Sequence, residues 1–322
     1  FESILSHGFV VDGKGLKMSK SAGNTISPEE ILKKYGADIL RIWVSASNYA
    51  EDLRIDHSIL EQHADAYRKI RNTFRYLLGN LKDNYSSINY NKFDTKNLPE
   101  LEQFMLHKIA ILDINFHNNF NSYNFHNLYK ELLNFCTVDL SSFYFDIRKD
   151  TLYCDDEKSI KREGCIKILN IILDCLIKWF APILTFTTEE IFKIVNKNNK
   201  SIHLENFPKI PSEWNNSILA NKWEELLKIR DYVNISLENK RSEKEIGSSL
   251  EAKVELKLKN NLFEKFSNFD FEELLIISSA DVINDDSIKD DIQVSTTKAN
   301  GKKCPICWKI RSDECELSLI HI

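Results

Sequence analysis

Residues 60–81 read LEQHADAYRKIRNTFRYLLGNL. Large, mostly apolar side chains recur here at alternating spacings of three and four, at Leu60, His63, Tyr67, Ile70, Phe74, Leu77 and Leu81. Because an α-helix makes one turn every 3.6 residues, this spacing places all of them on one face. The stretch therefore predicts a long amphipathic helix with a buried stripe.

Three more stretches have the same helical spacing. Their apolar positions are Leu101, Met105, Ile109, Leu112, Phe116 and Phe120; then Phe125, Leu128, Leu132, Phe135 and Val138; then Ile166, Leu169, Leu173, Leu176 and Phe180. Four stripes of this length can bury one another, which predicts an antiparallel helical bundle over residues 51–215. Pro182 interrupts the last stripe, and Thr187 with Glu190 predicts the capping box of a short fifth helix.

Residues 1–50 have the pattern of the end of an α/β unit. We expect a strand at 7–11, a turn at Asp12, and a polar loop over 17–24. A first helix is predicted to start at Ser27, Pro28 and Glu30, where Ser27 and Glu30 can form a capping box, and to stop at Gly36. A second helix is predicted over 37–45. The chain begins with Phe1 rather than Met, and we expect it to be a piece of a longer protein.

Residues 216–300 change character and predict a small α+β module. Trp223, Leu226, Leu227, Val233 and Leu237 mark a helix. Apolar and charged residues then alternate over 252–258, which indicates a half-buried strand, and 274–277 and 292–294 are further strand candidates.

Composition fits a soluble, mainly helical chain of two or three domains. Among 322 residues there are only 9 Gly and 6 Pro, 43% are hydrophobic, and the formal net charge is −5. This acidic balance gives no general argument for nucleic-acid binding. The most apolar stretch, 166–184, contains Lys167, Asn170, Asp174 and Lys178, which excludes a membrane span. Seven cysteines with irregular spacing favour a reducing cytoplasm over a disulfide framework.

The loop Lys17-Met18-Ser19-Lys20-Ser21 is the sharpest chemical signal. Two lysines on one mobile loop are suited to phosphate oxygens, because an ammonium group is a compact point charge. The alternative is an ordinary solvated surface loop, which is the commoner fate of lysine-rich loops.

The segment DGKGLKMSKSAGN (12–24) resembles the signature loop of class I aminoacyl-tRNA synthetases. Five later segments resemble the bacterial type of the isoleucyl family in particular: GADILRIWV (36–44), YRKIRNTFR (67–75), WFAPIL (179–184), GSSLEA (247–252) and KCPICW (303–308). The resemblance runs in order over almost the whole chain. It implies the C-terminal portion of such an enzyme: the end of a Rossmann-like catalytic domain (1–50), an anticodon-binding bundle (51–215), a small tRNA-contacting α+β module (216–300) and a truncated zinc-binding segment (301–322).

The resemblance also implies a reaction, that of an isoleucine–tRNA ligase in protein biosynthesis. Isoleucine would attack ATP, bound with Mg2+, to give the adenylate, and the aminoacyl group would pass to tRNA(Ile). Lys17 and Lys20 would be catalytic, residues 17–21 (Lys17, Met18, Ser19, Lys20, Ser21) would bind ATP, and Gly23 and Asn24 would shape the exit of the loop.

The chain departs from the family in what it lacks. A His-x-Gly-His segment, the isoleucine pocket and an editing domain are not found in the sequence, so we expect a piece that is inactive alone. We also expect a cytoplasmic monomer. The alternative is a stand-alone tRNA-binding module or a decayed gene product without catalysis.

Arg68, Arg71 and Arg75 flank the first helical stripe, with Lys69 beside them. One interpretation is contact with tRNA phosphates, and the other is boundary arginines that pair with carboxylates. Trp214, Trp223 and Tyr232 are available for stacking on unstacked bases, but the sequence does not assign a base-reading residue.

Cys304 and Cys307, spaced C-x-x-C, are half of a four-cysteine zinc ribbon. Cys315 is the one candidate for a third ligand of Zn2+, and His321 is a weaker candidate for a fourth. A prematurely ended or frameshifted terminus explains the missing pair equally well. We expect this segment to be disordered when no metal binds.

Overall fold

The computed structural model describes residues 2–81, 85, 88–196 and 200–312. The chain forms two compact units. The first consists of Phe1–Tyr144 and Gly164–Asn215, and the second of Phe145–Glu163 and Asn216–Ile322. Helices predominate, as predicted, and the division into four segments stays a prediction.

The first unit begins with a small α/β portion. Its elements are β1 (Val10–Asp12), α1 (Pro28–Tyr35), α2 (Ala37–Ala46) and β2 (Leu53–Ile55). The two strands pair in parallel, with Val10 opposite Leu53. The Ser27 hydroxyl accepts the Glu30 amide at 3.2 Å, and Gly36 ends α1 at φ 86°, both as predicted. The Glu30 carboxylate does not close a capping box; it lies 3.3 Å from His57 Nε2.

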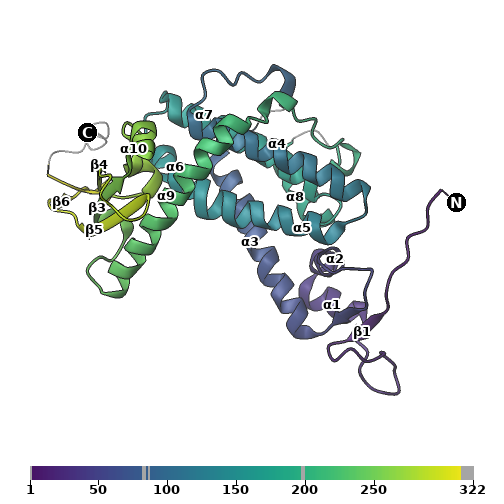
Figure 1. Cartoon of the computed structure of the whole chain (residues 1–322). Coiled ribbons are helices and arrows are strands. Elements are labelled where there is room, and N and C mark those ends of the chain that lie inside the picture. Colours follow the sequence, from purple (N-terminus) through teal and green to yellow (C-terminus); the bar gives the residue numbers. More distant parts are fainter. Residues whose placement is uncertain (1, 82–84, 86–87, 197–199, 313–322) are drawn as a thin grey trace. The chain divides into compact units, whose positions relative to one another are not determined.

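Helices make up the rest of this unit (Figure 1). The longer helices are α3 (His57–Leu81), α4 (Glu100–Asn121), α5 (Phe125–Asn134), the π-helical η3 (Phe135–Tyr144), α7 (Ile160–Phe180) and α8 (Thr185–Val195). The first turn of α7 belongs to the second unit. Three short 3-10 turns are η2 (Tyr90–Lys92), η4 (Ile202–Leu204) and η5 (Ser212–Trp214). α4 packs on α5, and η3 packs on α3 and α5. The predicted stripe of α3 is confirmed as core, since Leu60, Ile70 and Leu77 have no exposed surface.

The predicted capping box at Thr187 is wrong. α8 begins two residues earlier, at Thr185, directly after a turn in which the Leu184 amide donates to the Phe180 carbonyl at 2.7 Å. Thr187 therefore lies in the first turn, and its hydroxyl donates to Asp38 at 2.6 Å. Within the described part of the chain, no helix is both long and apolar enough to cross a membrane.

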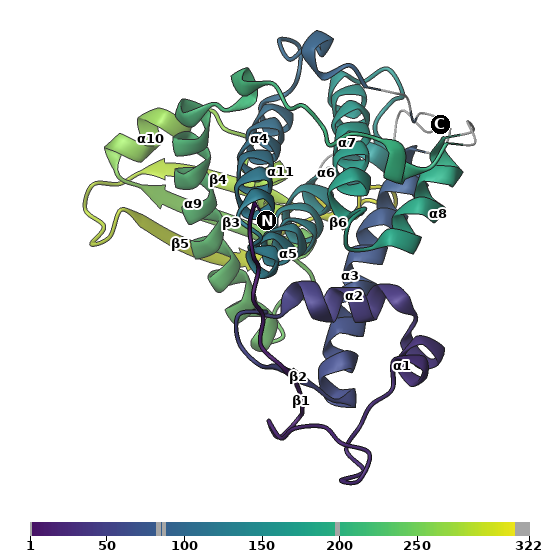
Figure 2. The same cartoon turned by 90° about the vertical axis from the view of Figure 1, so that its right-hand side faces the viewer.

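The second unit combines helices with a three-stranded sheet (Figure 2). Its elements are α6 (Phe145–Cys154), α9 (Ser217–Ser242), the 3-10 turn η6 (Ser249–Glu251), β3 (Ala252–Leu258), α10 (Asn260–Phe266), α11 (Phe271–Leu275), β4 (Ser279–Asn284), β5 (Ile292–Lys298), β6 (Lys302–Lys303) and β7 (Ile310–Arg311). The sheet order is β4-β3-β5, with β4 parallel and β5 antiparallel to β3.

The alternation predicted for 252–258 is confirmed in β3. Ala252, Val254, Leu256 and Leu258 are fully buried. α9 packs on β5, and α10 packs on β3 and β4. On the opposite face, Lys253 pairs with Asp281 at 2.7 Å. The strand expected at 274–277 is wrong. Leu274 and Leu275 form the end of α11, Ile276 caps it in the left-handed conformation, and the strand begins only at Ser279.

Candidate functional site

The lysine loop follows β1 directly. An isolated antiparallel bridge joins Val11 to Lys17, so the chain reverses at the end of the strand. Met18 then packs against the buried cluster that includes Ile31, Trp43 and Leu60. This contact holds the middle of the loop against the unit.

Lys17 and Lys20, on either side of Met18, are exposed to solvent. Neither ammonium group lies within ion-pair distance of a carboxylate among the described residues. Between and beside them, the Ser19 hydroxyl accepts the Ala22 amide at 3.2 Å and lies 3.2 Å from the Ser21 hydroxyl. Among the described residues, the loop therefore carries two exposed lysines without a carboxylate partner on either side of an anchored methionine.

The outer face of α3 carries the predicted arginines. Arg68, Lys69, Arg71 and Arg75 are all exposed. Arg68 forms an ion pair with Asp65, as the structural alternative expects. In the described part of the chain Lys69, Arg71 and Arg75 have no such pair, and residues 66–81 contain no Asp or Glu. A strip of positive charge is therefore left on the second half of this helix.

Two of the three aromatic candidates for base stacking belong to the core. Trp214 is 4% exposed and packs edge-on to Tyr90 and Phe93. Trp223 is 2% exposed and packs against Phe269. Tyr232 alone of the three has a half-exposed ring.

The C-x-x-C pair lies at the tip of the β6–β7 hairpin. The Cys304 amide donates to the Lys309 carbonyl at 2.9 Å, and the Trp308 amide donates to the Cys304 carbonyl at 3.1 Å. Both sulfurs belong to buried residues that pack together. Cys315 and His321 lie outside the described residues. Across the ranges that are described, no three His, Cys, Asp or Glu side chains are grouped to hold a metal.

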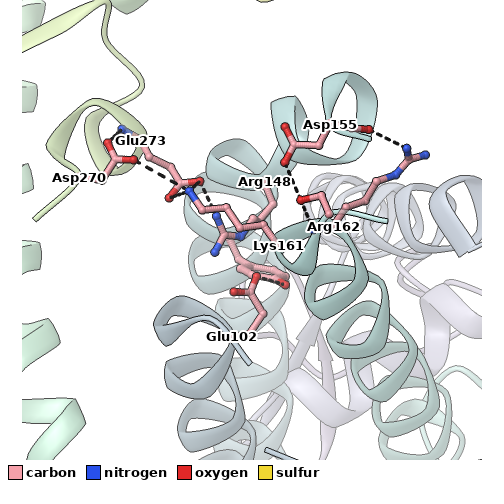
Figure 3. Close-up of polar contacts among 9 residues, drawn as sticks. Glu102, Arg148, Asp155, Lys161, Arg162, Asp270 and Glu273 are labelled. Atoms are coloured by element: carbon pink, nitrogen blue, oxygen red, sulfur yellow. Dashed lines mark hydrogen bonds and ion pairs between the residues drawn. The ribbon is translucent and has the colours of Figure 1, made fainter. Parts of the chain in front are cut away.

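A charged cluster that the sequence did not indicate lies in the second unit (Figure 3). The Glu273 carboxylate accepts hydrogen bonds from Arg148 at 2.6 Å and from Lys161 at 3.1 Å. Arg148 is 2% exposed, so this is a largely buried pair. These partners are 125 and 112 residues apart in the chain, and no local pattern marks them.

Neighbours of Glu273 in the chain contact the cysteine hairpin. Glu272 lies 3.8 Å from Lys309 and 3.9 Å from Arg311, and the Ile310 amide donates to the Ser278 hydroxyl at 2.6 Å. A small cavity of about 160 Å³ lies among these side chains, lined also by Cys307 and Asp150. Burial raises the pKa of the Asp150 carboxyl.

Comparison with known proteins shows which family the chain resembles. Residues 1–56 match the model for class I tRNA synthetases (I, L, M and V), and residues 102–256 match the anticodon-binding domain of tRNA ligase. The isoleucine–tRNA ligase of Pelagibacter ubique is 66% identical over 98% of this chain and 35% of its own length.

The chain belongs to the isoleucine–tRNA ligase family. The enzyme of the same name from Agrobacterium fabrum is 41% identical over 97% of the chain and 33% of its own length, and that from Caldanaerobacter subterraneus is 40% identical over 96% and 34%. The chain thus spans about a third of the length of these ligases. A crystal structure of a LeuRS–tRNA–LeuAMS complex from Agrobacterium radiobacter has the same fold over 79% of this chain and 25% of its own, with a TM-score of 0.53 at 14% identity.

The two family matches cover the candidate sites unequally. The lysine loop lies inside the synthetase match at 1–56. The arginines of α3 lie between the two matches, so their assignment in this isoleucine–tRNA ligase relative depends on the geometry of α3 alone.

Proposed function

We propose that the chain supplies the ATP-contacting loop and the tRNA-binding helices of an isoleucine–tRNA ligase. The observation that carries the proposal is the pair of unpaired, exposed ammonium groups of Lys17 and Lys20 on a loop fixed by Met18. In the reaction, the isoleucine carboxylate attacks the α-phosphate of ATP, pyrophosphate leaves, and the aminoacyl group then passes to the terminal ribose of tRNA(Ile).

Lys20 is the residue proposed to contact the phosphates of ATP, which arrives with Mg2+, and Lys17 and Ser19 are proposed to support the closed loop. Charge develops on the phosphate oxygens as the adenylate forms, so a positioned ammonium group stabilises the transition state more than the bound substrate. Met18 has a different part, since its side chain anchors the loop.

The first test is isoleucine-dependent ATP–pyrophosphate exchange. In the full-length ligase, we expect Lys20→Ala to lower kcat strongly with a smaller change in KM for ATP. Lys33→Ala, an exposed lysine of α1, is the matched control and should exchange like the parent. An unchanged kcat in Lys20→Ala would overturn the assignment. The 322-residue chain alone should give no exchange.

The second test measures tRNA(Ile) binding by the chain across a salt series. Each phosphate contact contributes about 0.9 to the slope of log affinity against log salt on duplex nucleic acid. Arg71→Ala with Arg75→Ala should therefore weaken binding and reduce the slope by about 2. Lys33→Ala, an exposed change in α1 outside the proposed tRNA-binding helices, should change neither. An unaltered slope in the double variant would remove α3 from the interface.

Finer points belong to the same proposal. We infer an antiparallel anticodon-binding bundle, a cytoplasmic monomer, and Zn2+ held by Cys304, Cys307 and Cys315. Metal analysis of the purified chain checks the last point, with about one zinc expected per chain and none if the site is incomplete.

The competing function is a stand-alone tRNA-binding module, which the anticodon-binding match over 102–256 favours. It predicts tRNA binding by the chain and no exchange by any protein that contains it.

A further inference from the structure

The carboxylate of Asp12 is surrounded by amide donors at the start of the lysine loop. Its Oδ1 accepts the backbone amides of Lys14 at 3.0 Å and Leu16 at 2.8 Å. Its Oδ2 accepts the side-chain amide of Asn24 at 2.9 Å. These hydrogen bonds, that from Asn24 foremost, hold the pKa of Asp12 below its ordinary value of 3.8.

The side chain of Asn24 reaches both sides of Met18. Its Nδ2 also lies 3.3 Å from the Lys17 carbonyl, and its Oδ1 accepts the Ser19 amide at 3.0 Å. One carboxamide therefore joins the end of β1 to the main chain on either side of the anchored methionine. The loop is tied at its two ends and in its middle by a single pair of side chains.

We propose that Asp12 and Asn24 form a latch that positions Lys17 and Lys20, and this role rests on the function proposed above. A lysine side chain is flexible, so the direction of its ammonium group depends on a fixed backbone. Asp12 is also the acidic residue closest to the two lysines in sequence, and its carboxylate is engaged by amide donors. Because amide donors already satisfy both oxygens of Asp12, its charge stays near the loop without capturing either ammonium group.

The reciprocal exchange of the two residues tests the latch on the 322-residue chain. In Asp12→Asn two amide donors face each other, and in Asn24→Asp two carboxylates do. The double variant D12N/N24D restores one donor and one acceptor between positions 12 and 24. The new aspartate still accepts the Ser19 amide but cannot donate to the Lys17 carbonyl. Initial rates of tryptic cleavage after Lys17 and Lys20 report how well the loop is held.

We expect each single variant to be cleaved about five-fold faster, the factor that corresponds to one ordinary hydrogen bond. The double variant should be cleaved more slowly than either single variant but faster than the parent, because the contact with the Lys17 carbonyl is not restored. Cleavage after Lys158, in a turn of the second unit, is the internal standard and should not change. Asn118→Asp, an exposed change of the same chemistry, should behave as the parent. Single variants that are cleaved at the parent rate would overturn the latch, and so would a double variant as fast as the singles.

A second arm, in the full-length ligase, separates the latch from the proposed function. There, Asn24→Asp should lower kcat for ATP–pyrophosphate exchange with less effect on KM, and D12N/N24D should recover part of the loss. Absence of exchange in the parent ligase, together with the expected proteolysis, would refute the proposed function and leave the loop contact intact. Normal exchange by Asn24→Asp would refute the positioning role itself.

Discussion

At the scale of single residues, Asp38 shows how a distant side chain fixes a helix start. Its carboxylate is 7% exposed and accepts the amides of Phe186 and Thr187 at 3.2 and 2.8 Å, besides the Thr187 hydroxyl. Negative charge at the positive end of α8 is stabilising, and the donors would otherwise be buried without partners.

We expect Asp38→Ala to lower the free energy of unfolding by about 3 kcal/mol, the size typical of losing charge-assisted buried hydrogen bonds. Urea denaturation of the chain measures it. Asp65→Ala removes a carboxylate that is mostly exposed and should change the same quantity by less than about 1 kcal/mol. Equal effects of the two variants would contradict this account of α8.

The burial of His63 predicts that the stability of the folded chain depends on pH. Its ring lies on the inner stripe of α3, and burial lowers its pKa from the ordinary 6.5. The unfolded chain therefore binds the proton at a higher pH than the folded chain does. The contribution of a neutral His63 to stability is complete above about pH 7 and is lost as the pH falls through 6.5 toward the folded pKa.

The variant His63→Gln isolates this contribution, because glutamine does not titrate. We expect its unfolding free energy to change less between about pH 7 and pH 5 than that of the parent chain. An NMR titration of the His63 ring should place its pKa below 6.5. A ring pKa at or above that value would show that the imidazole is hydrated in the folded chain.

Sequence reasoning at residue scale succeeded where a group acts locally and failed where its partner is remote. Ser27 and Gly36 fix the ends of α1 through contacts within a few residues, and both were predicted. Thr187 was misassigned because its partner, Asp38, is 149 residues away. The placement of the lysine loop was predictable, but the reach of Asn24 back to Asp12 depends on how the loop folds.

At the scale of elements, two glycines give opposite expectations. Gly79 is exposed within α3, and a Cβ added there would meet nothing within 4 Å. Gly79→Ala should raise the free energy of unfolding by about 0.5–1 kcal/mol, because glycine loses more conformational freedom in a helix. Thermal melting checks this, and a lower Tm would contradict it.

Gly301 precedes the cysteine hairpin at φ 135°, and a Cβ there would lie 2.2 Å from the Arg311 carbonyl oxygen. Gly301→Ala should therefore loosen the hairpin. Hydrogen exchange at the Cys304 and Ile310 amides should become faster, while exchange in β3 stays unchanged. Unchanged protection of those two amides would show that the ion pairs of Glu272 suffice to hold the hairpin.

The predictions of helices and strands were correct where the hydrophobic periodicity of the sequence was strong. The long stripe of α3 and the alternation of β3 were right, because each pattern repeats several times. The apolar run at 274–277 is too short to show a period. The Asp270 side chain, which accepts the Glu273 amide at 3.0 Å, caps the helix that forms there. The π-helical η3 continues the chain from α5, and its apolar spacing reads as ordinary α-helix.

At the scale of the whole molecule, the second unit is built from two separated stretches of chain. Phe145–Glu163 supplies α6 and the first turn of α7, and the rest of the unit begins at Asn216. α11 packs on α6, and Glu273 meets Arg148 of that helix. A predicted boundary at 215 and 216 does not anticipate this, because no local composition shift marks α6.

We expect a fragment of residues 216–322 to fold poorly alone, since it lacks α6 and leaves Glu273 and the apolar side of α11 uncovered. Adding a peptide of residues 145–163 should increase its helicity by circular dichroism. The matched peptide with Arg148→Ala should do so less. Full native stability of 216–322 without the peptide would contradict the need for α6.

This split arrangement has a consequence during synthesis on the ribosome. Arg148 precedes Glu273 by 125 residues, and at about 5–20 residues per second its partner is made about 6–25 s later. For part of that interval α6 has already emerged from the ribosome, while the surface that covers it has not yet been made. The last segment of the first unit, Gly164–Asn215, is therefore synthesised after α6 and before the partner of α6 in the second unit.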